Sequence, residues 1–319
     1  MLPRLFKRCS AAALLSLSVL SPAFAKDTLH VAHDQWIGYS GFFVANAKGF
    51  FDEADLEIKT TQFSGPGDTI PPLIAGHIDV GLTTLYNLAL AAGKGESSLN
   101  AVYLLDTSNG ADAVVAAPDV KSVADLKGKR VAVTTGEVNH LLLTAALQSA
   151  NLTEADVKLV NMNADDAGAA LLAGRVDAAV TWEPWVTRAS AAGGHALYTS
   201  ADAADLILDS IVVTDATLEK RRDAIVRFIQ AVDRGVQYLR EHPQEGQEII
   251  AKALEISPED AAEMLTGGKV YGIAENKVLL GANGKGYDSL AAVADFLTQL
   301  GLISQPVDGQ ALLTGDLLP

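Results

Sequence analysis

The chain reads PLIAGHIDVGLTT at Pro72–Thr84 and ALLAGRVDAAVTW at Ala170–Trp182. The two stretches align without a gap, and each runs from the end of a helix through a glycine into an apolar run and a polar turn. Gly76 and Gly174 stand where a residue with left-handed backbone angles would end the helix. The repeat therefore predicts two lobes of similar build.

The apolar runs after the glycines predict strands at Ile78–Leu82 and Val176–Val180. Their continuous apolar character is typical of strands that are covered on both faces. Open α/β sheets bind ligands at the carboxyl ends of their strands. We therefore expect the two lobes to offer matching halves of one ligand site, in the manner of a clamp.

The first 25 residues have the pattern of a secretory signal peptide. A positive segment with Arg4, Lys7 and Arg8 precedes an apolar run at Ala11–Leu20 and an A-x-A motif ending at Ala25. The apolar run is about half the roughly 20 residues that span a bilayer. We expect cleavage after Ala25 and export to the periplasm.

The expected mature chain has 294 residues, with 21 basic and 39 acidic side chains and a formal charge of −18. This charge disfavours nucleic acid and anionic membranes as partners. The single cysteine, Cys9, lies in the signal segment, so the mature chain is expected to have no thiol, disulfide or lipid anchor. Its length suits two domains.

Strand and helix patterns alternate along the mature chain, which indicates mostly parallel sheets flanked by helices, an α/β architecture. The chain is expected to cross between lobes twice, near Ser108 and near Leu208. Two such crossings would form a hinge. The first lobe would then be discontinuous, with residues 26–108 plus 209–319, and the second would comprise residues 109–208.

Four motifs carry a family resemblance: AKGFF at Ala47–Phe51, AGHIDVG at Ala75–Gly81, VADLKGK at Val123–Lys129 and WEPW at Trp182–Trp185. With them the chain resembles the periplasmic substrate-binding proteins of ABC importers, in the nitrate, sulfonate and taurine group that includes thiamine-precursor binders. The resemblance implies the type II two-lobe fold, a small-molecule solute and a permease in the inner membrane. The Trp-Asp-Pro pattern of taurine and alkanesulfonate binders has Glu183 in place of Asp.

Ligand contacts are expected in the first lobe at two kinds of position. Trp36 and Tyr39 lie in a loop between a strand and a helix, where they either form a wall of the cleft or pack in the core. Thr83 and Thr84 end the repeated strand, where a hydroxyl can cap the next helix, bind a ligand or do both.

In the second lobe, the equivalent position is the turn before the helix that follows Val133. Thr134 and Glu137 fit a capping box, which favours a structural role for Glu137. The residues expected to meet a ligand here are Thr135, Gly136, Asn139 and His140.

The end of the second repeated strand supplies Trp182 and Glu183 as further candidates. Pro184 suits the first position of a helix, which would place Glu183 near the N-cap and Trp182 at the strand end. Trp185 is expected to pack.

Asp106 and Asp209 flank the two crossings. There a carboxylate can hold a ligand amine or make hydrogen bonds within the hinge.

Enzyme motifs are absent: the mature sequence has no nucleophile elbow, no H-E-x-x-H and no cysteine. We therefore expect a monomeric solute receptor, not an enzyme, with no cofactor or metal. A secreted enzyme or a sensory partner on the same fold is the less favoured alternative. The expected solute is a small zwitterion, taurine or an alkanesulfonate-like compound, because helix N-termini combined with acids suit both of its charges. If the acids dominate, the solute is instead a cationic or amidine-like nitrogen compound, or a thiamine pyrimidine precursor, enclosed by Trp36, Tyr39 and Trp182.

Overall fold

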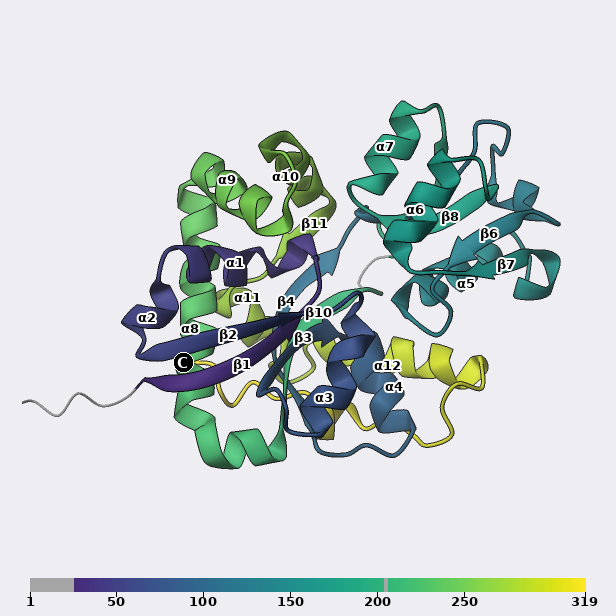
Figure 1. Ribbon diagram of the computed structural model, residues 1–319. Coiled ribbons are helices and arrows are strands. Elements are labelled where there is room, and N and C mark those ends of the chain that lie inside the picture. The colour runs from purple at the N-terminus through teal and green to yellow at the C-terminus, as the bar shows by residue number, and fades with distance from the viewer. Residues whose placement is uncertain (1–25, 204–205) are drawn as a thin grey trace, which may run out of the picture.

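The computed structural model describes residues 26–203 and 206–319, which form two sheets with helices packed on both faces (Figure 1). The expected signal peptide, with its cleavage site after Ala25, lies outside the described residues. The first sheet has the order β11 (Gly268–Val270), β4 (Leu99–Ser108), β10 (Leu208–Thr214), β3 (Val80–Thr84), β1 (Asp27–His33), β2 (Leu56–Gln62). The second has the order β7 (Lys158–Asn161), β6 (Arg130–Val133), β8 (Ala178–Trp182), β5 (Asp112–Ala116), β9 (His195–Thr199).

The two sheets share one pattern of pairing. β1 pairs in parallel with β2 and β3, and β6 pairs in parallel with β7 and β8. On its other side, β3 pairs with the antiparallel strand β10, and β8 pairs with the antiparallel strand β5. The sequence prediction of an α/β fold with two sheets flanked by helices is therefore confirmed, and the repeated strands occupy equivalent places. The sheets are mixed and not mostly parallel, because five of the nine strand pairings among the described residues are antiparallel.

Both repeated strands begin two residues later than the sequence analysis predicts. β3 starts at Val80 and β8 at Ala178, because the preceding aspartate belongs to a turn that is fixed by the neighbouring strand. Asp79 Oδ2 accepts from His30 N at 2.9 Å, and Asp177 Oδ2 accepts from Arg130 N at 2.8 Å. The repeated aspartates thus hold the same structural position in both lobes.

The repeated glycines end their helices as predicted. Gly76 has a φ of +70° and Gly174 a φ of +67°, both in the left-handed region. A side chain at either position would strain the turn between helix and strand.

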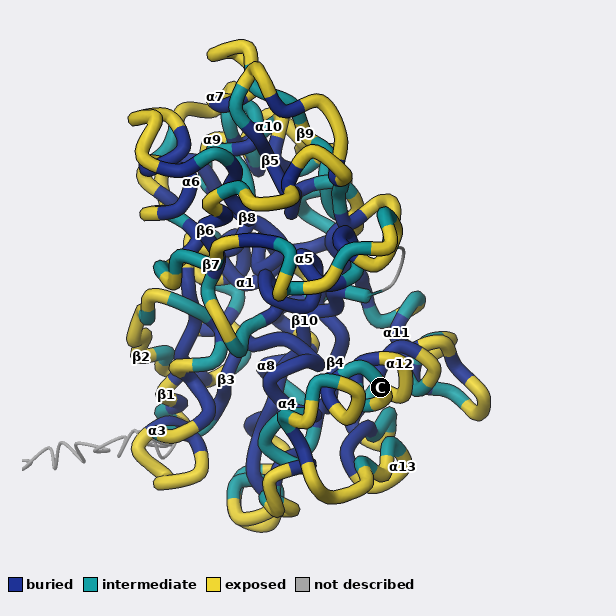
Figure 2. The backbone as a smooth tube through the Cα atoms, turned by 90° about the vertical axis from the view of Figure 1, so that its right-hand side faces the viewer, coloured by how far each residue is buried: buried dark blue, intermediate teal, exposed yellow. Residues whose placement is uncertain are grey.

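Helices cover both faces of each sheet, so each sheet has a core on either side. In Figure 2 the central strands, such as β3, β4 and β10 in the first lobe, form the buried centre of each lobe. The helices of the first lobe are α1 (Ser40–Ala47), α2 (Phe50–Glu53), α3 (Ile70–Ile74), α4 (Leu85–Gly93), α8 (Asp215–Glu241), α9 (Pro243–Leu254), α10 (Pro258–Met264), α11 (Ile273–Leu279), α12 (Lys285–Gln299) and α13 (Gly309–Leu312). Those of the second are α5 (Val138–Ser149), α6 (Ala164–Leu172) and α7 (Trp185–Ala191). Short 3₁₀ turns lie at Ile37–Tyr39, Pro66–Thr69, Val123–Leu126, Glu154–Asp156 and Leu265–Gly267.

Helix α8 crosses α1 at close range. This contact holds the start of α1, and with it the preceding loop that contains Trp36, in place. A Cβ on Gly235 of α8 would lie 2.0 Å from the carbonyl oxygen of Gly41. Only glycine permits this approach of the two backbones. Beside the crossing, the rings of Phe51 and Phe228 stack with their centroids 5.1 Å apart.

The chain passes between the two sheets in two adjacent segments. Ser108 N, at the end of β4, donates to Ile207 O at 3.0 Å, directly before β10. Thr107 Oγ1 donates to the same carbonyl at 3.1 Å. The crossing segments are therefore hydrogen-bonded to each other.

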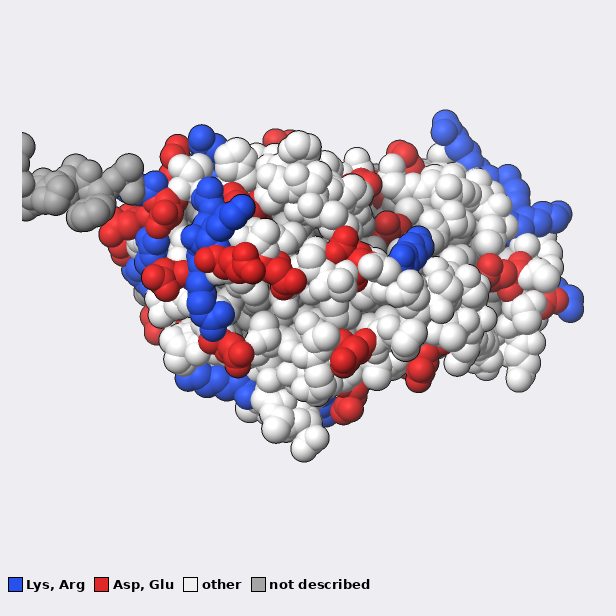
Figure 3. Space-filling view, turned by 90° about the horizontal axis from the view of Figure 1, so that it is seen from below, with Lys and Arg blue, Asp and Glu red and all other residues white. Residues whose placement is uncertain are grey.

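The surface carries both charge signs. On the face shown in Figure 3, acidic side chains are spread over both lobes and basic ones lie among them. Within residues 26–203 and 206–319, no helix is both long and apolar enough to cross a bilayer.

Candidate ligand-binding site

The carboxyl ends of the parallel strands of both sheets face each other across the gap between the lobes. A cavity of about 20 Å³, which is room for about one water molecule, lies there. A second cavity of about 310 Å³ shares Trp182 with it and is also lined from both lobes. The small cavity is lined by Asp34, Trp36, Pro66, Thr84, Asp112, Val138, Trp182, Ile207 and Asp209.

Two indole rings from opposite lobes meet at this cavity. The ring centroids of Trp36 and Trp182 are 6.4 Å apart, with an angle of 55° between the planes. Trp36 follows β1 and is buried, and Trp182 ends β8. These rings offer flat, electron-rich faces to a ligand, of the kind that attracts cations.

Two buried aspartates lie behind the rings in the first lobe. Trp36 Nε1 donates to both carboxylate oxygens of Asp106, at 3.1 and 3.2 Å. Tyr39 OH donates to Asp209 Oδ1 at 3.0 Å. Asp106 and Asp209 lie directly opposite each other on β4 and β10, so two like-charged groups share one buried position.

Burial raises the pKa of the four buried aspartates in this region, Asp34, Asp106, Asp112 and Asp209. The pKa of Asp34 rises to about 7, and that of Asp112 to about 6. For Asp106 and Asp209, loss of hydration raises the pKa, and neighbouring aspartates raise it further. No Lys or Arg is among the described residues that line the small cavity, so no cationic side chain faces these carboxyl groups there.

Several buried polar atoms around the gap have no hydrogen-bond partner. Asp34 Oδ1 and Asp112 Oδ2 can accept a hydrogen bond, and Tyr86 OH and Asn139 Nδ2 can donate one. Each of these four residues is at least 96% buried. Asp34 and Asp112 line the small cavity, and because buried polar groups in proteins are normally paired, their free oxygens indicate a position for a polar ligand.

The start of α7 holds Glu183 in a structural contact. Glu183 accepts from Thr187 N and from Thr187 Oγ1, each at 3.0 Å, with one carboxylate oxygen for each bond. Pro184 is the N-cap of α7 and not its first residue, so the sequence prediction was wrong by one position. Glu183 therefore stands before the cap and secures the first turn of the helix.

Both tryptophans of the WEPW motif are bonded to Asp165 at the start of α6. Asp165 Oδ1 accepts from Trp182 Nε1 at 3.1 Å and from Trp185 Nε1 at 2.8 Å. The second contact agrees with the expectation that Trp185 packs. The first fixes the tilt of the Trp182 ring against Trp36.

The capping box predicted before α5 does not form. Thr134 Oγ1 donates to Met162 O at 3.1 Å, and Glu137 is itself the N-cap, without a side-chain bond to its own helix. Thr135 is exposed, and its N–H donates to Asn161 Oδ1. The sequence prediction was wrong because strand β7 and the loop after it offer these groups partners that are remote in sequence.

The remaining second-lobe candidates lie around the first turns of α5. Gly136 N donates to His140 Nδ1 at 3.2 Å, and His140 Nε2 lies 2.9 Å from Glu154 Oε1. Asn139 is buried with a free amide nitrogen. His140 Nε2 makes no hydrogen bond but lies beside the Glu154 carboxylate, whereas the Asn139 amide nitrogen has neither a hydrogen-bond partner nor an ion-pair partner.

The two threonines that end β3 have different surroundings. Thr83 is fully buried, and its hydroxyl donates to Pro66 O at 2.8 Å. Thr84 is the N-cap of α4, accepts from Asn87 N at 3.1 Å and lines the small cavity. Thr84 therefore caps α4 and also forms part of the wall of the small cavity.

The structure brings four of the predicted residues to the small cavity: Trp36, Thr84, Trp182 and Asp209. The sequence analysis missed Asp34, although it stands directly after β1, where parallel strands place ligand-binding groups. It also missed Asp112, which is the first residue of β5. Asp112 is recognised as a site residue by its position opposite Trp182 in the pairing of β5 and β8. This pairing is known only once the fold is known.

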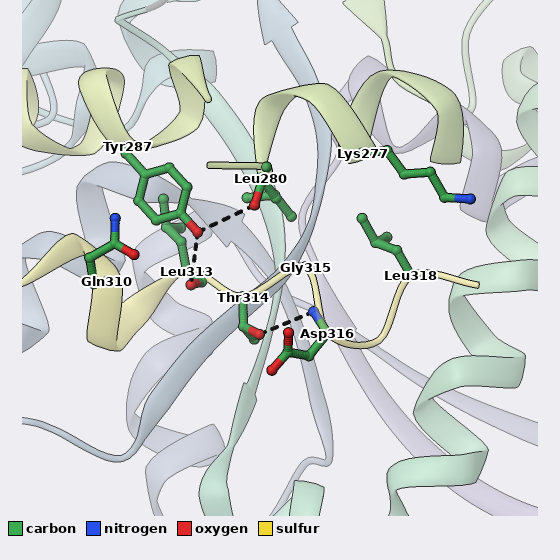
Figure 4. A pocket seen from close by; sticks show the side chains of 10 residues that line it. Lys277, Leu280, Tyr287, Gln310, Leu313, Thr314, Gly315, Asp316 and Leu318 are labelled. Carbon is green, nitrogen blue, oxygen red and sulfur yellow. Dashed lines mark hydrogen bonds between the residues drawn. The ribbon is translucent and has the colours of Figure 1, made fainter. Parts of the chain in front are cut away.

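A larger cavity, of about 460 Å³, lies away from the strand ends between α11, α12 and the C-terminal segment (Figure 4). Tyr287 OH lies between Leu280 O at 3.3 Å and Leu313 O at 3.4 Å. Thr314 Oγ1 accepts from Asp316 N. All of the residues that line this pocket belong to the first lobe, so we place the candidate site between the lobes, where both contribute.

Two sheets of matching topology, joined by two crossings and facing each other across a polar gap, define the fold of the periplasmic binding proteins. The structure is similar to that of the periplasmic aliphatic sulphonate binding protein from Escherichia coli, with a TM-score of 0.76, 22% sequence identity, and coverage of 92% of this chain and 99% of that one. The predicted type II two-lobe fold is thereby confirmed.

The family model described as NMT1/THI5 like matches residues 36–246, and the chain belongs to this family. A protein of Brucella abortus, named as a binding protein, is 25% identical over 310 residues, which are 95% of each chain. A protein of Haemophilus influenzae, named as a thiamine biosynthesis protein, is 27% identical over 252 residues, which are 73% of this chain and 75% of that protein.

Proposed function

We propose that this protein is a periplasmic receptor for a small solute, which it captures between two closing lobes and delivers to an ABC permease. The proposal is supported by the family, by the fold shared with a sulphonate binding protein, and by a site built from both lobes. Secretion by the N-terminal signal and a monomeric state belong to the same proposal.

For the solute, we favour a cationic or hydrogen-bond-donating nitrogen compound over taurine or another alkanesulfonate. The observation that carries this preference is the group of buried aspartates at the small cavity, Asp34, Asp112 and Asp209, with Asp106 behind Trp36. A ligand with N–H groups or a positive charge would pair with these carboxylates. A sulfonate would meet them without a lysine or arginine to balance its charge.

The unpaired atoms refine this description of the solute. Acceptors at Asp34 and Asp112 call for donors on the ligand, whereas the donors at Tyr86 and Asn139 call for an acceptor. A compact molecule with amino or amidine groups and one ring nitrogen or oxygen meets both demands. The planes of Trp36 and Trp182 favour a flat molecule.

The test is a thermal-shift screen that compares amines, amidines and aminopyrimidines with taurine and ethanesulfonate, followed by calorimetry on each compound that raises the melting temperature. We expect stabilisation by the nitrogen compounds. Asp34→Asn should weaken their binding roughly 10- to 100-fold, the loss of one charge-assisted hydrogen bond. Asp119→Asn, which removes an exposed carboxylate, serves as the matched control.

Mass spectrometry of the bound compound distinguishes a receptor from an enzyme. A receptor releases the compound unchanged in a one-to-one ratio, whereas an enzyme releases a product of different mass. If ethanesulfonate stabilises the protein and the nitrogen compounds do not, the proposed ligand class is wrong.

A further inference from the structure

Glu137 reaches from the second lobe into the first. It directly precedes α5, yet its carboxylate bonds to α4 and not to its own helix. With the Asn87 amide turned so that its oxygen accepts from Gly67 N at 3.1 Å, the Asn87 nitrogen donates to Glu137 Oε2 at 3.2 Å. A Cβ on Gly67 would lie 2.1 Å from Glu137 Oε1, so the carboxylate lies directly over this glycine.

The place that Glu137 occupies is the first turn of α4. Thr84 is the N-cap of this nine-residue helix, and Asn87 is its third residue. The first turn of a helix attracts negative charge, since its N–H groups and dipole are positive there. The first turn of α4 contains no acidic residue of its own, so the second lobe supplies the carboxylate.

The position also belongs to the wall of the ligand site. Three residues beside this contact line the small cavity. Pro66 precedes Gly67, Thr84 is the N-cap of α4, and Val138 follows Glu137. Burial raises the pKa of Glu137 to about 7, in keeping with a carboxylate enclosed between the lobes. Tyr86, whose hydroxyl has no hydrogen-bond partner, lies within the electrostatic influence of Glu137.

We propose that Glu137 is a specificity-determining residue, a built-in anion at the start of α4 that excludes anionic solutes from this end of the cleft. The inference rests on the proposed function. A sulfonate or carboxylate on a solute could reach the helix only by displacing Glu137, which would leave two negative groups in one enclosed space. A neutral or cationic solute meets no such repulsion.

The experiment measures binding of ethanesulfonate and inorganic sulfate by calorimetry to the full mature protein and two variants. Glu137→Ala should bind ethanesulfonate at least tenfold more tightly than the parent, because it removes both the charge and the bulk. Glu137→Gln, which keeps the bulk and removes the charge, should fall between the two. Asp68→Ala removes a neighbouring exposed carboxylate and should behave as the parent does.

Equal affinity of the parent and Glu137→Ala for ethanesulfonate, including no binding by either, would overturn the inference. A gain of the same size in Asp68→Ala would also overturn it, because the cause would then be net charge. Should Glu137→Ala fail to fold, Gly67→Ala offers a second route, since its Cβ would push the carboxylate out of place and should also admit ethanesulfonate.

The nitrogen compounds, measured on the same samples, separate the two proposals. If they bind the parent and Glu137→Ala gains no ethanesulfonate binding, the inference about Glu137 is wrong and the proposed function stands. If they fail to bind the parent, the proposed ligand class is wrong, whatever the effect of Glu137.

Discussion

Each acid at the site behaves according to the groups that surround its carboxylate. Asp106 is held by the indole of Trp36 and Asp209 by the hydroxyl of Tyr39, whereas Asp34 keeps a free oxygen. Glu183 has the type of side chain expected to meet a ligand, but it is bonded to Thr187. The same chemical group thus supports the structure in one place and remains available for a ligand in another.

Gly38 is the residue that lets Trp36 and Asp106 meet. A Cβ there would lie 1.9 Å from Asp106 Oδ2 and 2.4 Å from Trp36 Nε1, in fully buried surroundings. Gly38→Ala should therefore lower the free energy of unfolding by about 1–3 kcal/mol, the usual effect of overpacking. Urea denaturation measures the change.

Gly65→Ala is the matched control for this prediction, because a Cβ at Gly65 meets nothing within 4 Å. Its effect should stay within about 0.5 kcal/mol, as for most surface changes. Equal stability of the two variants would mean that the contact between Trp36 and Asp106 is not rigid.

The raised pKa of Asp34 predicts opposite effects of pH on stability and on ligand binding. Because the folded-state pKa, about 7, exceeds the ordinary value of 3.8, the folded protein binds the proton more tightly than the unfolded chain does. The contribution of Asp34 to stability is therefore full below pH 3.8 and is lost as the pH rises to about 7. The affinity for a cation should instead increase over pH 6–8, as the carboxyl ionises.

Thermal melting and calorimetry across this range check both effects. Asp34→Asn should flatten the two pH dependences together. The prediction would be contradicted if the melting temperature of the ligand-free parent rose between pH 5 and pH 7 and did so with the same slope as the melting temperature of Asp34→Asn.

At the scale of elements, the two lobes use the repeated threonine in the same way. Thr83 Oγ1 donates to Pro66 O at 2.8 Å, and Thr181 Oγ1 donates to Ala164 O at 2.7 Å, in each case 17 residues back along the chain. Each bond ties the end of the repeated strand to the start of the preceding helical segment. The repeat thus conserves a strand-to-helix bond as well as an apolar pattern.

Thr83→Val and Thr181→Val should each lower the free energy of unfolding by about 1 kcal/mol, the net contribution of one buried hydrogen bond. Valine keeps the shape of the side chain, and Thr→Ser at each position keeps the hydroxyl as a control. Urea denaturation followed by circular dichroism compares the four variants. If Thr83→Val also abolishes solute binding while Thr181→Val does not, Thr83 contacts the solute.

At the scale of the whole molecule, the arrangement of the lobes decides access to the site. The cavity between Trp36 and Trp182 has room for about one water molecule, so a solute larger than water requires the lobes to separate before it enters. The two crossing segments, joined through Ile207, are the natural place for that rotation. Contacts from both lobes then favour the closed form when the solute is bound.

Small-angle scattering should therefore give a smaller radius of gyration with a saturating nitrogen compound than without it. The ion pair between Arg188 of α7 and Asp260 of α10, at 3.9 Å, is partly exposed and should contribute little to closure. Arg188→Ala is accordingly a control that keeps the response to the solute. An unchanged radius of gyration in the parent would indicate a rigid pocket or a solute held by one lobe.

Sequence patterns alone were enough to predict the alternation of strands and helices and the helix ends at Gly76 and Gly174. These features depend on local backbone preference and on the period of apolar residues, which neighbouring residues express without the rest of the fold. For the same reason, the loop with Trp36 and the strand end at Trp182 could be recognised as candidates.

Which polar groups remain available to a ligand depends on the three-dimensional fold. Glu137 matched a local capping pattern, yet its carboxylate lies against α4 of the other lobe, and Asp112 faces the cavity because β5 pairs with β8. Whether a carboxylate is paired or free depends on groups tens to hundreds of residues away in the chain, brought near by sheet pairing and by the approach of the lobes. The local sequence around a carboxylate does not show which of these remote groups will lie near it, because only folding brings them together.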